Sequence, residues 1–234
     1  MKNEFKVTEP DSLVIRLQNS GKEFFYKKHT NTVYVLSNDT LFTFSKSKEF
    51  NKGLYLFGLV KKDFDNYLME NPNPIKEDFY APIRVKKEIY TGCEFHYDIN
   101  HAYWRIAYIN GYISENTYNH GLNLKNSNEE LKKLYCMALS VQGQSKTLDG
   151  YVNNKITGNT YTINKNPLHK LIYQNIRNKT HKIVSDISDK IWEDFIEYRV
   201  DGIFFNGKNN CEIVENHLIK ENLTFKKYNY DKNS

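Results

Sequence analysis

The sequence predicts an α+β protein in which an antiparallel sheet carries its helices on one face and follows a small β-rich N-terminal region. Residues 1–60 contain several short runs of β-forming residues, and two later segments repeat apolar residues at helical spacing. After Tyr90, strands and helices follow one another in an order that suits a single layered sheet. The stretch Asn71–Pro74 breaks the chain, so we expect an N-terminal region over 1–74 and an α+β domain over 75–234.

The N-terminal region is expected to be built mainly from short strands. β-branched and aromatic residues cluster over 13–17, 32–36 and 41–44, and turn-forming residues separate these runs. One short helix is expected over 61–71, where apolar residues recur at helical spacing before the prolines.

The C-terminal domain is expected to mix strands with helices. A helix over 129–141 should open with a capping box, because Ser127 and Glu130 stand three residues apart before an apolar period. The other elements expected are strands over 83–98, a helix over 104–113, a hairpin within 146–165, a long helix from Pro167 with a break near 178–180, a strand around Asp201, and strands over 211–214 and 224–228.

The composition describes a polar chain with no feature of a membrane or secreted protein. Hydrophobic residues make up 39% of the 234 positions, and mean hydropathy is −0.70. No apolar run reaches the length of a membrane span, and the N-terminus is too polar for a signal peptide. Three widely separated cysteines favour a reducing compartment, so we expect a cytoplasmic protein, in the host cytoplasm if it is viral. A net charge of +5 permits contact with nucleic acid without requiring it.

Two aspartates are the strongest candidates for chemistry. Asp98 stands where a strand gives way to a helix, and Asp201 stands inside the apolar stretch Tyr198–Phe205. A carboxylate among apolar residues is costly to bury without a partner, and a divalent cation offsets the repulsion between two carboxylates. The pair therefore suggests a metal site if neighbouring strands align them. The alternative is structural: Asp98 would cap the helix and Asp201 would sit in a β-turn.

The surroundings of these acids resemble two motifs of family B DNA polymerases, such as those of viruses and phages. Tyr97–Trp104 is similar to motif A, with Asp98 at the metal-binding aspartate and Tyr103 at the tyrosine that packs under the sugar. Tyr198–Phe204 is similar to motif C, with Asp201 at its metal-binding aspartate. The resemblance covers residues 90 to 230 and implies a palm domain with reduced fingers.

The resemblance implies two-metal nucleotidyl transfer on a DNA primer-template. Asp98, Asp201 and the carbonyl of Ile99 would hold Mg²⁺, and Tyr103 would exclude a 2′-hydroxyl. Candidates for contact with the triphosphate are Lys132, Lys133 and Arg177, and candidates for contact with nucleic acid are Lys226, Lys227 and Tyr228.

The sequence also departs from the family. Trp104 replaces the usual proline of motif A, the first aspartate of motif C is absent, and Tyr135 stands where motif B has a lysine. Neither a thumb nor an exonuclease domain is recognisable, so a protein partner would have to supply them. The alternative is therefore a catalytically inactive, palm-like module that binds protein or nucleic acid, including single-stranded DNA, through aromatic rings and lysines.

Overall fold

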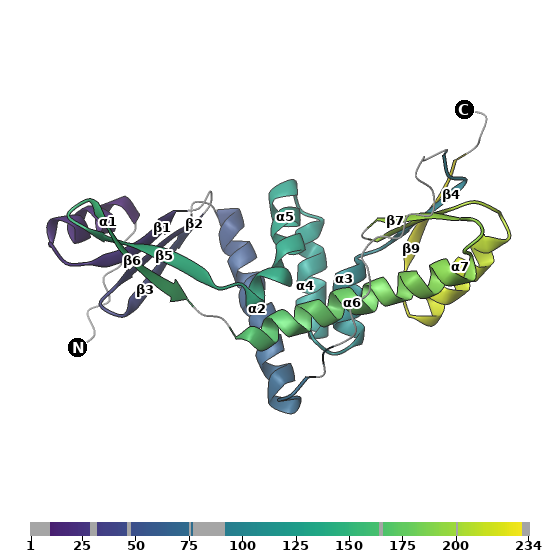
Figure 1. Ribbon diagram of the computed structural model, residues 1–234, viewed down its shortest axis with the longest axis horizontal. Coiled ribbons are helices and arrows are strands. Elements are labelled where there is room, and N and C mark those ends of the chain that lie inside the picture. The colour runs from purple at the N-terminus through teal and green to yellow at the C-terminus, as the bar shows by residue number, and fades with distance from the viewer. Residues whose placement is uncertain are drawn as a thin grey trace. The chain divides into compact units, whose positions relative to one another are not determined.

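The computed structural model describes residues 10–28, 32–45, 48–74, 76, 92–163, 166–199 and 201–230, and within them it is an α+β protein (Figure 1). Seven α-helices and two antiparallel sheets make up this described part, which confirms the predicted class. The chain forms two compact units, one from Met1–Leu59 with Gly121–Pro167 and the other from Val60–His120 with Leu168–Ser234.

The unit boundaries differ from the expected division at residue 74. They fall inside helix α2 (Lys48–Glu70) and helix α4 (Glu115–Lys125). The physical reason is visible in α2, which is much longer than the helix expected over 61–71. Its first half packs Gly53 against Leu134 of the first unit, and its second half packs Phe64 against His169 of the second. The prolines at 72 and 74 mark the end of α2, whereas the boundary between the two units is set by which residues each half of α2 contacts.

The first unit contains a five-stranded antiparallel sheet. Its strands are β1 (Phe24–Lys28), β2 (Thr32–Ser37), β3 (Thr40–Ser45), β5 (Lys146–Val152) and β6 (Lys155–Ile163), in the order β3-β2-β1-β5-β6. The strands expected over 32–36 and 41–44 and the hairpin expected within 146–165 are confirmed. Because β1 pairs with β5, the N-terminal strands and the later hairpin form one sheet.

Residues 13–17 form part of helix α1 (Pro10–Asn19), and the expected strand there is wrong. Proline is well suited to the first helical position, and Asp11 in the first turn favours the helix dipole. Leu13 packs with Phe24 of the sheet, while Ile15 is 55% exposed. The apolar run therefore follows a helical period, which a run of only five residues did not reveal. Figure 1 shows α1 beside the strands of this sheet.

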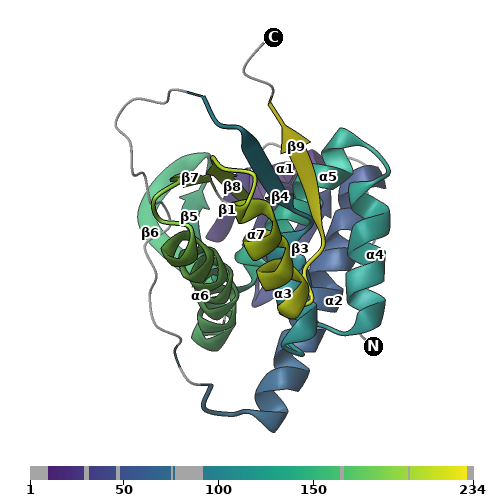
Figure 2. The same ribbon diagram turned by 90° about the vertical axis from the view of Figure 1, so that its right-hand side faces the viewer.

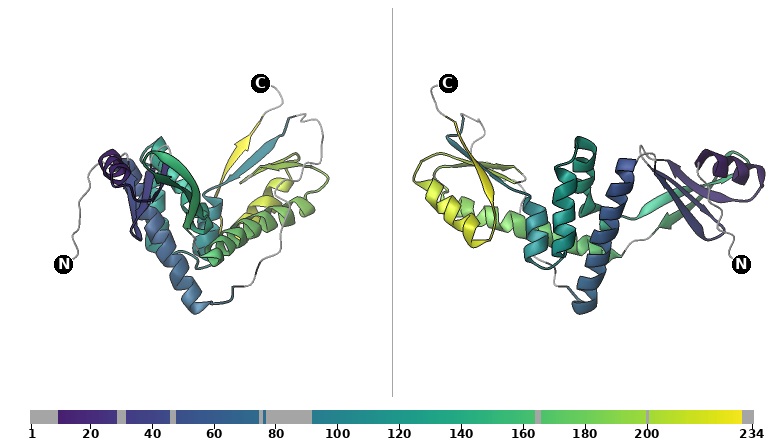
Figure 3. Two further views of the ribbon diagram at one scale, coloured as in Figure 1. Left: turned by 60° about the vertical axis from the view of Figure 1, so that its left-hand side comes forward. Right: turned by 180° about the vertical axis from the view of Figure 1, so that it is seen from behind.

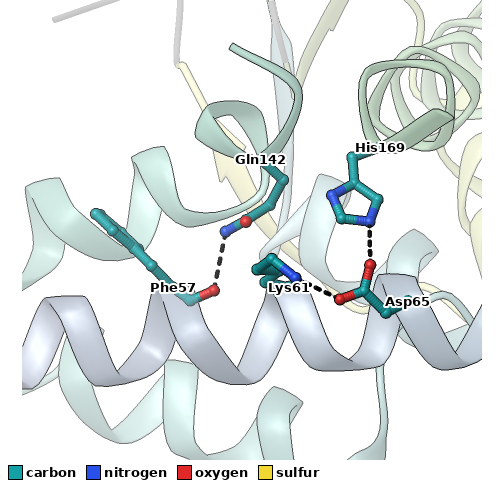
Figure 4. A network of polar contacts seen from close by, with 5 residues as sticks. All are labelled: Phe57, Lys61, Asp65, Gln142 and His169. Carbon is teal, nitrogen blue, oxygen red and sulfur yellow. Dashed lines mark hydrogen bonds and ion pairs between the residues drawn. The ribbon is translucent and has the colours of Figure 1, made fainter. Parts of the chain in front are cut away.

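The helices of the first unit are tied together by polar contacts. Gln142, in a short 3-10 turn over Ser140–Gly143 (η1), donates from Nε2 to the carbonyl of Phe57 at 3.1 Å (Figure 4). Helix α5 (Glu129–Ala138) begins one residue later than the capping box predicts. Its N-cap is Asn128, whose Oδ1 accepts a hydrogen bond from the Leu131 amide at 2.9 Å.

The second unit contains a four-stranded antiparallel sheet in the order β7-β8-β4-β9. Along the chain these strands are β4 (Phe95–Ile99), β7 (Phe195–Arg199), β8 (Gly202–Phe205) and β9 (Phe225–Asn229). Helix α3 (Ala102–Ile109) and helix α6 (Pro167–Lys190) lie between β4 and β7 in the sequence, and helix α7 (Asn210–Lys220) lies between β8 and β9. With α6 as the crossover helix, the order is that of a split β-α-β unit.

Helices α6 and α7 cover the same face of this sheet, as predicted (Figures 2 and 3). Tyr97 donates its hydroxyl to Glu215 of α7 at 2.5 Å, and Tyr198 contacts His181 of α6 at 3.0 Å. Tyr97 and Tyr198 are both paired with Ile203, so their side chains lie on one face.

Three further expectations for this unit need correction. Residues 211–214 belong to α7, because Cys211, Val214 and Leu218 are buried at helical spacing. Helix α6 continues without a break through 178–180, since the buried hydroxyl of Thr180 donates to the Ile176 carbonyl at 2.9 Å. The strands expected over 83–98 are described only from residue 92, and β4 begins at Phe95.

A buried histidine joins α2 to α6 in the second unit. His169 is 2% exposed and donates from Nε2 to Asp65 at 2.8 Å, and Lys61 binds the other carboxylate oxygen of Asp65 at 2.5 Å (Figure 4). Burial raises the pKa of the Asp65 carboxyl, but the hydrogen bonds from Lys61 and His169 lower it by more, so the pKa lies below its ordinary value. The buried polar groups at this helix crossing are thus paired.

Candidate functional site

The backbones of the two candidate acids lie side by side. The amide of Ile99 donates to the carbonyl of Asp201 at 2.8 Å, and Asp98 is paired with Gly202 across β4 and β8. The expected alignment on neighbouring strands is therefore confirmed. Asp98 does not cap the following helix, because it lies within β4 and the N-cap of α3 is His101 with φ 55°. Asp201 does lie in a turn, which joins β7 to β8.

Tyr103 and Arg177 lie in the neighbourhood of Asp201. Burial raises the pKa of Tyr103, the negative charge of Asp201 raises it further, and a hydrogen bond from Arg177 opposes both effects. Burial also holds the pKa of Tyr198 far above its ordinary value, with Tyr103 and Asp201 adding to the shift. These electrostatic interactions place residues from α3, α6 and the β7–β8 turn in one neighbourhood.

His181 supports this cluster from α6. It is 3% exposed, its Nδ1 lies 3.0 Å from the Tyr198 hydroxyl, and its ring meets that of Tyr103 edge-on at 6.4 Å. Its Nε2 has no hydrogen-bond partner among the residues that the structure describes. Burial, and then the positive charge of Arg177, lower the pKa of His181 from its ordinary value of 6.5. The imidazole is consequently neutral at pH 7.

The free energy of unfolding is expected to decrease as the pH falls below about 6.5. The unfolded chain protonates His181 at its ordinary pKa, whereas the folded chain resists protonation until a lower pH, so acid favours unfolding. Burial lowers the pKa of His96 and His217 in the same direction. Urea unfolding of the wild type and of His181→Gln at a series of pH values tests this. We expect a shallower decrease for His181→Gln, and identical pH dependence of the two proteins would contradict it.

The two lysines expected near a triphosphate belong to the other compact unit. Lys132 and Lys133 are exposed on α5, where Lys132 forms an ion pair with Glu129 at 3.2 Å. Arg177, in contrast, belongs to the same unit as both acids. Of the three candidates for contact with the triphosphate, only Arg177 therefore shares a unit with Asp98 and Asp201.

The residues expected to contact nucleic acid divide between the two faces of the sheet. Lys226 is paired with Asp98 and Tyr228 with His96, so both side chains share the face of Asp98. Lys227 is paired with Tyr97 on the opposite face, where it binds Glu215 of α7 at 3.0 Å. Lys227 thus ties β9 to α7.

No family model, curated protein or solved structure matches this chain. The resemblance to family B polymerases depends on the motifs around Asp98 and Asp201 alone.

The residues at the end of β4 suit Mg²⁺ better than a metal that requires a protein cage. No group of three or more His, Cys, Asp or Glu side chains is arranged to hold a metal within the described ranges. Mg²⁺ needs few protein ligands, because it keeps several waters and uses one or two carboxylates. Asp98, Ile99 and Asp201 are the residues from which a magnesium site would be built, because their backbones meet at the end of β4.

A cavity of about 460 Å³ in the second unit was not expected from the sequence. None of the residues proposed for the site lines it; its walls are part polar and part apolar, and they include Lys179, which donates to Asn110 Oδ1 at 2.6 Å. The lining residues are Tyr67, Asn71, Pro72, Asn73, Pro74, Asn110, Tyr112, Asn175 and Lys179. Residues scattered over three segments give no local sequence signal.

None of the helices in the described part of the chain is long and apolar enough to cross a membrane. None of the three cysteines forms a disulfide within the described residues; Cys93 and Cys211 are buried and Cys136 is exposed.

Proposed function

We propose that this protein is a divergent nucleotidyltransferase that extends a primer on a DNA template, with Asp98 and Asp201 as its metal-binding acids. One observation supports this above the others. The hydrogen bond from the Ile99 amide to the Asp201 carbonyl joins the two segments that resemble motifs A and C. Residues far apart in the sequence thus meet as the motifs imply.

The residues around the acids have clear roles in such a reaction. Asp98, Asp201 and the Ile99 carbonyl would hold Mg²⁺, which supplies charge neutralisation and activation of a primer hydroxyl. Arg177 would bind an oxygen of the transferred phosphate, because its guanidinium is already held beside Tyr103. Tyr103 would present its ring to the sugar, with its hydroxyl fixed by Arg177.

Primer extension tests the proposal directly. The full chain is incubated with a labelled primer-template, all four deoxynucleoside triphosphates and Mg²⁺. We expect the primer to lengthen, and we expect EDTA to stop extension and excess Mg²⁺ to restore it. No incorporation by folded protein over a range of Mg²⁺ and Mn²⁺ concentrations would contradict the proposal.

Binding without catalysis is the second candidate, and a different observation favours it. Lys226 and Tyr228 share the face of Asp98 with further aromatic rings, which suits contact with a nucleic-acid strand whether or not the acids are active. In that case the chain binds nucleic acid with equal affinity in Mg²⁺ and in EDTA, and it does not extend a primer.

A further inference from the structure

The four-stranded sheet of the second unit has one face that the unit's helices leave uncovered. Helices α6 and α7 contact the face of Tyr97 and Tyr198. Because side chains alternate along a strand, His96 and Asp98 point to the opposite face of β4. The cross-strand pairs place Phe204 of β8 and Tyr228 of β9 beside His96 on that same face. In Figures 2 and 3, α6 and α7 lie together on one side of these strands, which is the side opposite the His96 face.

A stack of aromatic rings crosses this face from strand to strand. The centroids of His96 and Phe204 lie 4.2 Å apart with their planes 4° from parallel, and those of His96 and Tyr228 lie 5.1 Å apart at 17°. Tyr230 adds a fourth ring 6.5 Å from His96 at 11°, and its hydroxyl lies 3.4 Å from Nδ1 of His96. Three rings from adjacent strands, and the ring of Tyr230 just after β9, are therefore nearly parallel.

Gly202, on the strand beside His96, leaves space for the imidazole ring of this stack. A Cβ at Gly202 would lie 2.9 Å from Nε2 of His96, so only glycine allows the imidazole to take its place.

The stack ends in ring surface open to solvent. Tyr228, in edge strand β9, is 41% exposed, and Tyr230, just after this strand, is 48% exposed. At the other end, the guanidinium of Arg199 lies 5.6 Å from the centre of the Phe204 ring, and the Arg199 side chain is 66% exposed. The exposed ammonium of Lys226 flanks the stack on β9.

We infer that this face binds an unpaired segment of nucleic acid, whose bases extend the ring stack at Tyr228 and Tyr230. The inference rests on the proposed function and names the form of substrate that lies beside Asp98. Bases are flat and stack on aromatic rings regardless of sequence, and four-stranded sheets with exposed rings bind single strands in this way. Paired bases already stack within a duplex, so the face selects unpaired ones.

The charges on this face indicate that stacking supplies most of the affinity. Arg199 forms an ion pair with Glu197 at 2.7 Å, and Lys226 lies across from Asp98. Two cations are thus available for phosphates, and two acids partly balance them. For a single strand, log K falls by about 0.7 per phosphate contact for each unit of log salt. We therefore expect a salt slope no steeper than about −1.4.

Fluorescence anisotropy with a labelled single-stranded oligonucleotide, and with the same sequence as a duplex, tests the inference. We expect the wild-type chain to prefer the single strand, and we expect Tyr228→Ala with Tyr230→Ala to weaken binding at least about fivefold. Tyr228→Phe should keep the affinity, because it keeps the ring. Tyr161→Ala is the matched control, since Tyr161 is 43% exposed on edge strand β6 of the other sheet.

Primer extension by the same wild-type preparation separates this inference from the proposed function. Single-strand binding that depends on Tyr228 and Tyr230 supports the inference, even if no primer is extended. Binding that is unchanged in the double variant overturns it, even if Mg²⁺-dependent extension is observed. Equal affinity for duplex and single strand, no binding by the wild type, or a salt slope steeper than about −3 also overturns it.

Discussion

Asp201→Asn is expected to lower the rate of Mg²⁺-dependent primer extension by more than about a hundredfold. Groups that only orient metal ligands already contribute 10- to 100-fold, and an amide in place of a ligating carboxylate removes the charge that attracts the metal. The substitution leaves the main-chain carbonyl that holds the Ile99 amide, so the junction of β4 with the turn should remain. Asp98→Asn should have a similar effect, because the proposed metal site requires both acids.

The matched control for this pair is Asp149→Asn, which replaces an exposed acid on β5 of the other unit. Single-nucleotide incorporation is measured for all four proteins over a Mg²⁺ titration, and circular dichroism checks that each is folded. We expect only the Asp98 and Asp201 variants to lose activity, and added Mg²⁺ should not restore it fully. Activity within about threefold of the wild type in either variant would exclude that acid as a metal ligand.

Parts of this molecule were predictable because their signals are local. The strands around Asp98 and Asp201 each combine β-forming residues with an acid near one end. The expected alignment of the two acids on neighbouring strands agrees with the observed pairing of Asp98 with Gly202, the residue after Asp201. The long helix α6 also carried a clear period, although its buried polar residues suggested a break. Thr180 bonds to the helix's own backbone, which is why α6 continues.

A short apolar run does not distinguish a strand from a helix in this chain. The runs over 13–17 and 211–214 contain too few residues to show whether their apolar positions repeat every 2 or every 3.6 residues, and both lie in helices. The division into two units also has no local signal in the sequence. It depends on the contacts of each half of α2, where Gly53 packs against Leu134 and Phe64 packs against His169.

The candidate site shows the same limit. Tyr103 could be identified from its spacing to Asp98, and the structure places it with Arg177 and Asp201. Lys132 and Lys133 were chosen for their nearness to a motif in the sequence, and they lie in the other unit. The ring stack of Phe204, His96 and Tyr228 has no local signal, because it depends on the register of β4 with β8 and β9, which follow β4 by about a hundred residues or more.

Gly53→Ala is expected to destabilise the folded protein by about 1–3 kcal/mol, although alanine is the better helix former. A Cβ at Gly53 would lie 2.4 Å from Cδ1 of Leu134 and 3.0 Å from its Cβ. Leu134 is 5% exposed, so its side chain has little space into which to move. Gly58→Ala on the same helix is the matched control, because a Cβ there meets nothing within 4 Å. That variant should gain about 0.5–1 kcal/mol from helix propensity alone.

A double-mutant cycle separates crowding at Gly53 from a general effect on the helix. Leu134→Ala alone should cost about 2–5 kcal/mol, because it leaves a cavity between α2 and α5. In the Leu134→Ala background, Gly53→Ala should cost nothing or should stabilise, because its methyl group then enters that cavity and the helix gains propensity. Urea unfolding of the four proteins gives the coupling energy between the two positions. Equal stability of the Gly53→Ala and Gly58→Ala variants would contradict close packing of α2 against α5 at Gly53 and Leu134.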